Sequence, residues 1–153
     1  MPTPNQPPRV HSYYRQLQMR VETWLSSEEA QHHPCAGLYP YLPELFLLLT
    51  GLGLDARVEE RERVAILSAL KYIVAPFDLI PEGILGPAGY CDDLVLAALV
   101  VDRLASKLDH ALLAQHWHGE VDVVTVARTI LASATTMVGD ETCTRLRGWL
   151  PVS

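Results

Sequence analysis

Apolar residues recur every three or four positions along most of this chain, which is the spacing of amphipathic helices. Over residues 9–29 the repeating apolar positions are Val10, Tyr13, Tyr14, Leu17, Val21, Trp24 and Leu25. Three prolines and a glycine follow over residues 32–43 and predict a linker. A short helix is then predicted over 43–50, with Gly51 and Gly53 expected to end it.

The next predicted helix covers roughly residues 55–75, with Asp55 as a candidate N-cap. The apolar positions assigned to its core-facing stripe are Val58, Val64, Leu67, Leu70 and Val74. Pro76 has no backbone N–H and disfavours helical geometry at Ala75, so the helix is expected to end there.

Residues 94–113 are apolar nearly all round as far as Asp102, a pattern typical of a central, buried helix. Residues 121–138 repeat apolar positions at helical spacing and are expected to stop at Gly139. A last short helix is predicted over residues 140–149. The chain is therefore expected to be all-α, a single compact domain of five to six helices around a central antiparallel pair, over residues 9–153 after a flexible tail at 1–8.

Residues 75–96 set helix breakers and acids between two apolar stretches. The breakers are Pro76, Pro81, Pro87, Gly83, Gly86 and Gly89, and the acids are Asp78, Glu82, Asp92 and Asp93. Prolines and glycines prevent a continuous helix here, so the connection is expected to turn the chain back and pack the two flanking helices antiparallel. That arrangement gathers the four acids at one end of the pair.

Three interpretations of these acids stay open. Asp92 or Asp93 suits an N-cap of the following helix, and Asp78 suits a cap of the turn after Pro76, because carboxylates accept unpaired backbone N–H groups. A metal or catalytic cluster of Asp78, Asp92 and Asp93 is the second interpretation, since hard cations prefer carboxylate ligands. A partner-binding surface is the third.

The segment "ALKYIVAPFDLIPEGILGPAGYCDDLVLAALVVDRL" resembles the YkvA-like family of small bacterial helical proteins and domains over roughly residues 45–110. The family pattern is a Pro-x-Asp-Leu-Ile-Pro-Asp segment followed by Gly-Tyr-x-Asp-Asp at the start of an apolar helix. The matching positions are Pro76, Asp78, Leu79, Ile80, Pro81, Gly89, Tyr90, Asp92 and Asp93. Glu82 replaces the usual Asp, and "GILGPAGY" differs modestly from the common "FIPVLGY". The resemblance implies a helical domain with a shared loop and no established activity, and some relatives are thought to sit near membranes.

The charge and composition of the chain limit the classes of ligand that it can bind. A net charge of −6 with only 12 Lys and Arg argues against nucleic acid and anionic lipid as ligands. The cysteines, Cys35, Cys91 and Cys143, form no disulfide framework, and the N-terminus has no signal-peptide pattern, so a cytoplasmic, reducing location is expected. No apolar run is long enough to cross a bilayer, although peripheral membrane association stays open.

Hydrophobic residues make up 49% of the chain. This surplus must be hidden in the fold or against a partner. We expect a protein partner or a homo-oligomer, with the face of residues 9–29 that carries Tyr13, Tyr14 and Trp24 buried against another chain.

Catalytic candidates are few. No nucleophile stands beside a base, and Cys91 next to Asp92 is expected to have a raised pKa. Zinc is a further hypothesis, in which the ligands would come from His32, His33, Cys35, His116 and His118. Lys71 is expected either to extend its amine to solvent or to pair with Asp78 or Asp92.

The sequence thus predicts a non-enzymatic interaction or assembly module without catalytic residues or cofactor. A carboxylate-based metal-dependent enzyme is the alternative, and a peripheral membrane protein is the third hypothesis.

Overall fold

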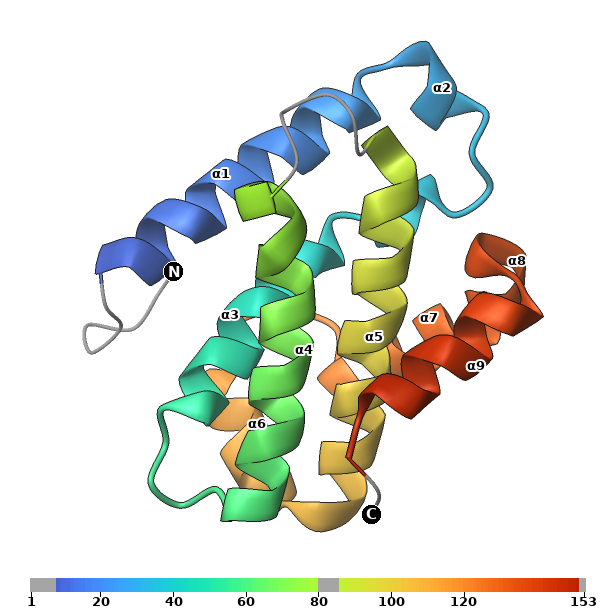
Figure 1. Cartoon of the computed structure of the whole chain (residues 1–153). Coiled ribbons are helices and arrows are strands. Elements are labelled where there is room, and N and C mark those ends of the chain that lie inside the picture. Colours follow the sequence, from blue (N-terminus) through green and yellow to red (C-terminus); the bar gives the residue numbers. More distant parts are fainter. Residues whose placement is uncertain (1–7, 80–85, 152–153) are drawn as a thin grey trace.

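The computed structural model describes the backbone of residues 8–79 and 86–151 and the side chains of residues 10–74 and 91–151. Within these ranges the chain forms nine α-helices, one short 3-10 helix and no strand, which confirms the all-α prediction while dividing the chain into more helices than expected (Figure 1). The elements are α1 (Pro8–Leu25), α2 (Glu28–Gln31), the 3-10 helix η1 (Ala36–Leu38), α3 (Tyr41–Gly53), α4 (Glu60–Leu79), α5 (Gly86–Lys107), α6 (His110–His116), α7 (Val123–Ala132), α8 (Ala134–Val138) and α9 (Asp140–Trp149).

Helix α5 is the centre of the fold. Every residue from Leu94 to Val101 is buried, as the all-round apolar pattern predicts, and Asp93 is buried as well. Helix α4 runs antiparallel beside α5, while α3, α7 and α9 pack on other sides of it (Figure 1). The segment richest in helix breakers therefore connects the two helices of the central pair.

Several helix ends differ from the prediction. Helix α5 begins at Gly86, earlier than expected. It ends at Lys107 because Asp109 starts α6 as an N-cap, its Oδ1 accepting the Ala111 N–H at 3.1 Å. Asp122 caps α7 through the Thr125 N–H. The helix predicted over 121–138 is divided at Ser133 into α7 and α8. Gly139 has a φ of 85° and ends α8 as predicted, and α9 has the predicted bounds.

Helix α4 begins at Glu60 and continues past Pro76 to Leu79, so the predicted end at Ala75 is wrong. A proline this close to the end of a long helix removes one hydrogen bond from the last turns, while the turns before it stay held by packing. Asp55 lies in the connection before α4 and is not its N-cap. Helix α3 continues through Gly51, because burial of its leucines outweighs the low helix propensity of glycine, and ends at Gly53 as predicted.

The core-facing side of α4 differs from the predicted stripe. Ala65, Ile66, Ala69 and Ile73 are buried against the rest of the fold. Val64 and Leu67, expected in the core, are 42% and 52% exposed. Neighbouring residues of an α-helix point about 100° apart. Residues that are next to the buried positions in the sequence therefore face another side of the helix. The apolar side chains of Val64 and Leu67 are therefore left on the surface.

The apolar face of α1 is buried within the chain itself, so its predicted contact with another chain is wrong. Tyr14, Leu17, Val21 and Trp24 are buried, chiefly against α3. The Tyr14 hydroxyl donates to the Glu44 carboxylate at 2.9 Å. No helix in the described ranges combines the length and apolarity needed to cross a membrane.

Candidate functional site

The acid-rich segment lies partly outside the described side chains. Pro76, Asp78, Pro81, Glu82 and Gly89, predicted as loop and capping residues, all belong to that part. The expected hydrogen bonds of Asp78 to loop amides therefore also fall outside the described residues. Of the four acids, Asp92 and Asp93 on α5 are the ones whose side chains the structure describes.

Asp92 and Asp93 lie inside α5 and do not cap its start, because the helix begins at Gly86. Asp92 faces α4 and α9. Its Oδ2 accepts a hydrogen bond from the Tyr72 hydroxyl at 3.2 Å and lies 3.3 Å from Nη2 of Arg145. Burial and the charge of Asp92 raise the pKa of Tyr72. Asp92 therefore ties three helices together.

Trp149 strengthens the same junction from α9. Its indole N–H donates to the Ser68 carbonyl at 2.7 Å. Its ring meets Tyr72 edge-on, with 5.3 Å between ring centroids, a geometry that aromatic pairs favour. Trp149 as a whole remains 45% exposed.

Asp93 points into the core and is 2% exposed. Its Oδ1 has no hydrogen-bond partner among the described residues. Burial, and secondarily the charge of Asp92, raises the pKa of the Asp93 carboxyl well above its usual range. The buried position therefore favours a neutral carboxyl or a cation beside it.

Cys91 precedes these acids and contacts a tyrosine in the core. Its thiol forms a hydrogen bond with the Tyr39 hydroxyl, and Tyr39 stacks on Trp24 with 4.4 Å between ring centroids. Burial raises the pKa of Cys91, an effect that the Tyr39 hydrogen bond partly offsets. A buried thiol with a raised pKa is a poor nucleophile, so these contacts indicate a packing role.

The predicted metal ligands do not converge in the described part of the chain. Neighbouring residues on a helix point about 100° apart, so Asp92 and Asp93 face different surroundings. No group of three or more His, Cys, Asp or Glu side chains suited to a metal ion exists among the described residues.

The histidines of the zinc hypothesis are also engaged separately. Nδ1 of His33 accepts the Cys35 backbone N–H at 3.0 Å, and the His33 ring meets Trp24 edge-on. His32 contacts the Glu28 carbonyl, and His116 lies in a different cluster, centred on Asp55. The contacts of these side chains therefore do not support the zinc site predicted from the sequence.

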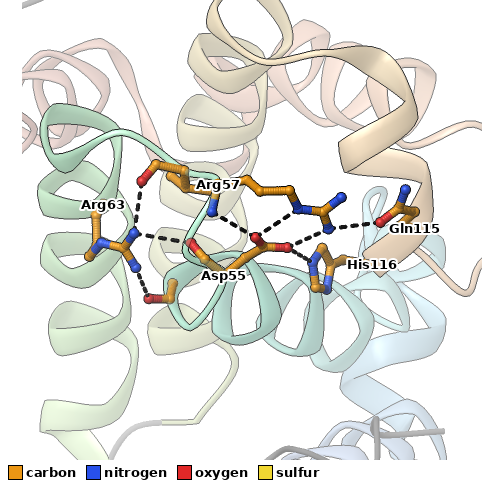
Figure 2. Close-up of polar contacts among 7 residues, drawn as sticks. Asp55, Arg57, Arg63, Gln115 and His116 are labelled. Carbon is orange, nitrogen blue, oxygen red and sulfur yellow. Dashed lines mark hydrogen bonds and ion pairs between the residues drawn. The ribbon is translucent and has the colours of Figure 1, made fainter.

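Asp55 is the centre of a polar cluster between α3, α4 and α6 that the sequence did not reveal (Figure 2). Its carboxylate accepts the backbone N–H of Arg57 at 2.9 Å and two guanidinium nitrogens of Arg57 at 3.0 and 2.7 Å. Nε2 of His116 lies 2.8 Å from its Oδ2. These contacts, led by the Arg57 hydrogen bonds, hold the pKa of Asp55 well below its usual range.

Two further side chains complete this cluster. Arg57 also donates to the side-chain oxygen of Gln115 at 2.8 Å (Figure 2). Arg63 donates to the carbonyl of Gly53 at the end of α3 and to two carbonyls of the α3–α4 connection (Figure 2). Arg57 and Gln115 line an open cleft of about 320 Å³ beside α6.

An Asp–His pair beside a cleft resembles the base of many hydrolases, but here the free imidazole nitrogen is covered. A Cβ added to Gly51 would lie 2.6 Å from Nδ1 of His116, so this nitrogen rests against the α3 backbone. Nδ1 therefore has no room to accept a proton from a substrate. We interpret the Asp55–His116 pair as a structural contact that holds α6 against the α3–α4 connection.

The outward side of α4 is the second feature that the sequence reasoning missed. Glu60, Val64, Leu67 and Lys71 stand one above another on one side of the helix and are all exposed, and we call them the α4 stripe. On one flank, Leu54 is 58% exposed and follows Gly53, which packs against Ile66 and Leu67. On the other flank is Trp149. The apolar spacing of Ala65, Ile66, Ala69 and Ile73 was the signal in the sequence that could have shown this orientation.

Residues 62–99 match the model of a family described as "Protein of unknown function (DUF1232)". This span falls within residues 45–110, which the sequence pattern singled out, and contains most of α4 and nearly the first two thirds of α5. The chain is also similar to "Uncharacterized protein ORF9" of Methanothermobacter thermautotrophicus, with 32% identity over 97 residues. The match covers 63% of this chain and 64% of that protein, so it spans slightly less than two thirds of the relative's length. No solved structure matches this chain.

Proposed function

We propose that this chain is a non-enzymatic protein-interaction or assembly module that docks its partners on the α4 stripe and its two flanks. The observation that carries the proposal is the exposure of large apolar side chains on and beside one helix. Val64, Leu67, Leu54 and Trp149 are between 42% and 58% exposed. Contiguous apolar groups of this kind mark interaction sites more often than isolated ones do.

The composition of this surface also suits docking. Tryptophan is enriched in the energetically dominant part of protein interfaces, and charged groups at the rim set orientation. Glu60 and Lys71 stand at opposite ends of the apolar pair. Helix α4 packs on α5, and its Tyr72 contacts both Asp92 and Trp149. A partner on this surface would therefore contact a firmly packed part of the fold.

Several finer assignments accompany this proposal. The match to a domain of unknown function supports placing the chain in the YkvA-like family. We also propose a single domain over residues 9–153 in the cytoplasm, with peripheral membrane association as a further option for the exposed tryptophan.

The alternative function, a carboxylate-based metal-dependent enzyme, is favoured by one observation. Asp93 is buried, and one of its oxygens has no hydrogen-bond partner among the described residues. A cation would remove the cost of such a carboxylate. Thermal unfolding with and without Mg²⁺, Mn²⁺ or Zn²⁺ tests this, since a bound ion raises the midpoint and the Asp93→Asn variant should lose the increase.

The interaction function is tested by affinity capture from the native host, with wild type, Leu67→Glu and Met19→Glu proteins as baits. Met19 is 63% exposed on α1 and is the matched control. We expect the Leu67→Glu bait to lose proteins that the wild type and the Met19→Glu baits both retain. Equal capture by all three baits would contradict the assignment of the surface.

A further inference from the structure

The spacing of the α4 stripe is the same in both directions along the helix. Its members, Glu60, Val64, Leu67 and Lys71, are separated by four, three and four residues. Such alternation of three and four places side chains in one line along a helix and is the spacing at which two helices pack side by side. The stripe carries an acid at its N-terminal end, a base at its C-terminal end and two apolar residues between them.

When a second copy of α4 packs antiparallel on the first, its sequence of acid, apolar pair and base is complementary to that of the first copy. Glu60 of one copy then faces Lys71 of the other, and Val64 of one faces Leu67 of the other. Twofold symmetry repeats both contacts, because an isologous interface uses the same surface on both subunits. We propose that the partner on the α4 stripe is a second copy of this chain, joined by antiparallel α4 helices about a twofold axis that passes between Val64 and Leu67. This inference rests on the proposed function and names its partner.

The surroundings of the stripe are compatible with that geometry. Figure 1 shows α4 at the front of the fold, with α3 and α5 on either side of it. Leu54 and Trp149 flank the stripe and would extend the apolar contact beyond the two central residues. Arg61 is also exposed, but it lies about 100° further round the helix than Glu60.

The charged ends are available for contacts between copies. The Glu60 side chain is 85% exposed, and its ion pair with Arg63 is long at 3.8 Å. Arg63 directs its two terminal nitrogens to the carbonyls of Gly53, Asp55 and Val58. Lys71 is exposed on the surface of α4. An antiparallel dimer would give each of these charges an opposite partner, whereas a parallel one would bring like charges together.

Charge reversal in the purified full chain tests the arrangement. Sedimentation velocity over a range of protein concentrations at low salt should show a concentration-dependent dimer for the wild type. Glu60→Lys and Lys71→Glu each place two like-charge pairs in the interface, so each should weaken dimerisation by about tenfold. The double variant Glu60→Lys/Lys71→Glu restores both pairs with reversed sign and should return the dissociation constant close to the wild-type value.

Two controls keep the result interpretable. Glu120→Lys reverses an exposed acid in the connection between α6 and α7 and should leave the dimer unchanged. Circular dichroism and the thermal midpoint should be alike for all variants at concentrations where they are monomeric, because the substituted side chains are exposed. Leu67→Glu should abolish the dimer.

A wild type that stays monomeric at all concentrations, or a double variant no better than the single ones, would overturn the antiparallel dimer. If the protein is monomeric while the Leu67→Glu bait still loses captured proteins, the self-association is wrong and the interaction function stands. If capture is also unaffected by Leu67→Glu, both are wrong.

Discussion

The imidazole of His116 lies 2.8 Å from the carboxylate of Asp55 and couples the end of α6 to the connection between α3 and α4. The two residues are 61 positions apart in the sequence. Asp55 thereby gathers hydrogen bonds from Arg57 and His116, while Gly51 provides the space in which the imidazole lies.

Asp55→Asn should destabilise the fold by about 1–3 kcal/mol at pH 7, because it weakens several charge-assisted hydrogen bonds. The folded-state pKa of Asp55 is lowered from a reference of 3.8, so its stabilising contribution is present above about pH 4 and is lost as the pH falls through the lowered value. The free-energy difference between wild type and variant, from urea unfolding, should therefore shrink below about pH 4. A difference that is constant with pH would show that the carboxylate charge is unimportant.

Gly51→Ala should destabilise the fold by about 1–3 kcal/mol despite the better helix propensity of alanine. The new methyl would lie 2.6 Å from Nδ1 of His116 and push the imidazole away from Asp55. Gly148→Ala, in α9, is the matched control, since no heavy atom of the described residues outside its own helix turn lies within 4 Å of its added Cβ. That control should be stabilising by about 0.5–1 kcal/mol. Equal effects of the two substitutions on thermal unfolding would argue against the close approach.

Glu62 and Arg103 form a buried ion pair between α4 and α5, with 2.9 Å between the carboxylate and Nε. Nη2 of Arg103 has no hydrogen-bond partner in the described part of the chain. Glu62→Gln leaves a buried guanidinium without its counter-charge and should cost about 3–5 kcal/mol in chemical unfolding. Glu62→Leu combined with Arg103→Met removes both charges and should recover most of that loss. A double variant as unstable as the single one would mean that the pair contributes more than charge balance.

Asp93→Asn should raise the thermal midpoint at pH 7 and have less effect near pH 4. The folded-state pKa of Asp93 is raised, so folding is penalised once the pH exceeds the unfolded-state pKa near 3.8, and the penalty grows until the folded-state pKa is reached. An amide cannot ionise and escapes this penalty. If Asp93→Asn lowers the midpoint at pH 7, the carboxylate has a cationic partner beyond the described side chains, and the metal alternative gains support.

The sequence predicts where helices form more reliably than which side of a helix faces the core. Leu94 to Val101 are apolar all round, and Gly139 suits a left-handed backbone, so the central helix and the start of α9 follow from local patterns. Val64 and Leu67 are as apolar as the buried Ile66 and Ile73. The sequence of α4 therefore offers two apolar spacings, and the packing of α4 on α3 and α5 selects the one that includes Ile66 and Ile73.

The polar clusters were harder to predict for a related reason. Asp55 sits before an apolar stripe with acids after it, which is also the pattern of an N-cap, and its partner His116 is remote in the sequence. Asp92 and Asp93 resemble a helix start because the prolines and glycines before them predict a loop. The helix nevertheless begins at Gly86, which places Pro87 in its first turn, where a proline is well tolerated because that turn needs no intrahelical N–H bond.

The central claim, that α4 is the docking surface and pairs with itself, is tested most directly by zero-length cross-linking. A carbodiimide joins carboxylates to amines in direct contact, and within one helix Glu60 and Lys71 are about 16 Å apart, too far to react. In an equal mixture of ¹⁵N-labelled and unlabelled protein, mass spectrometry should find a Glu60–Lys71 amide between labelled and unlabelled chains. Cross-linked chains without this linkage, or no linkage between chains at concentrations where sedimentation shows a dimer, would contradict the antiparallel α4 interface.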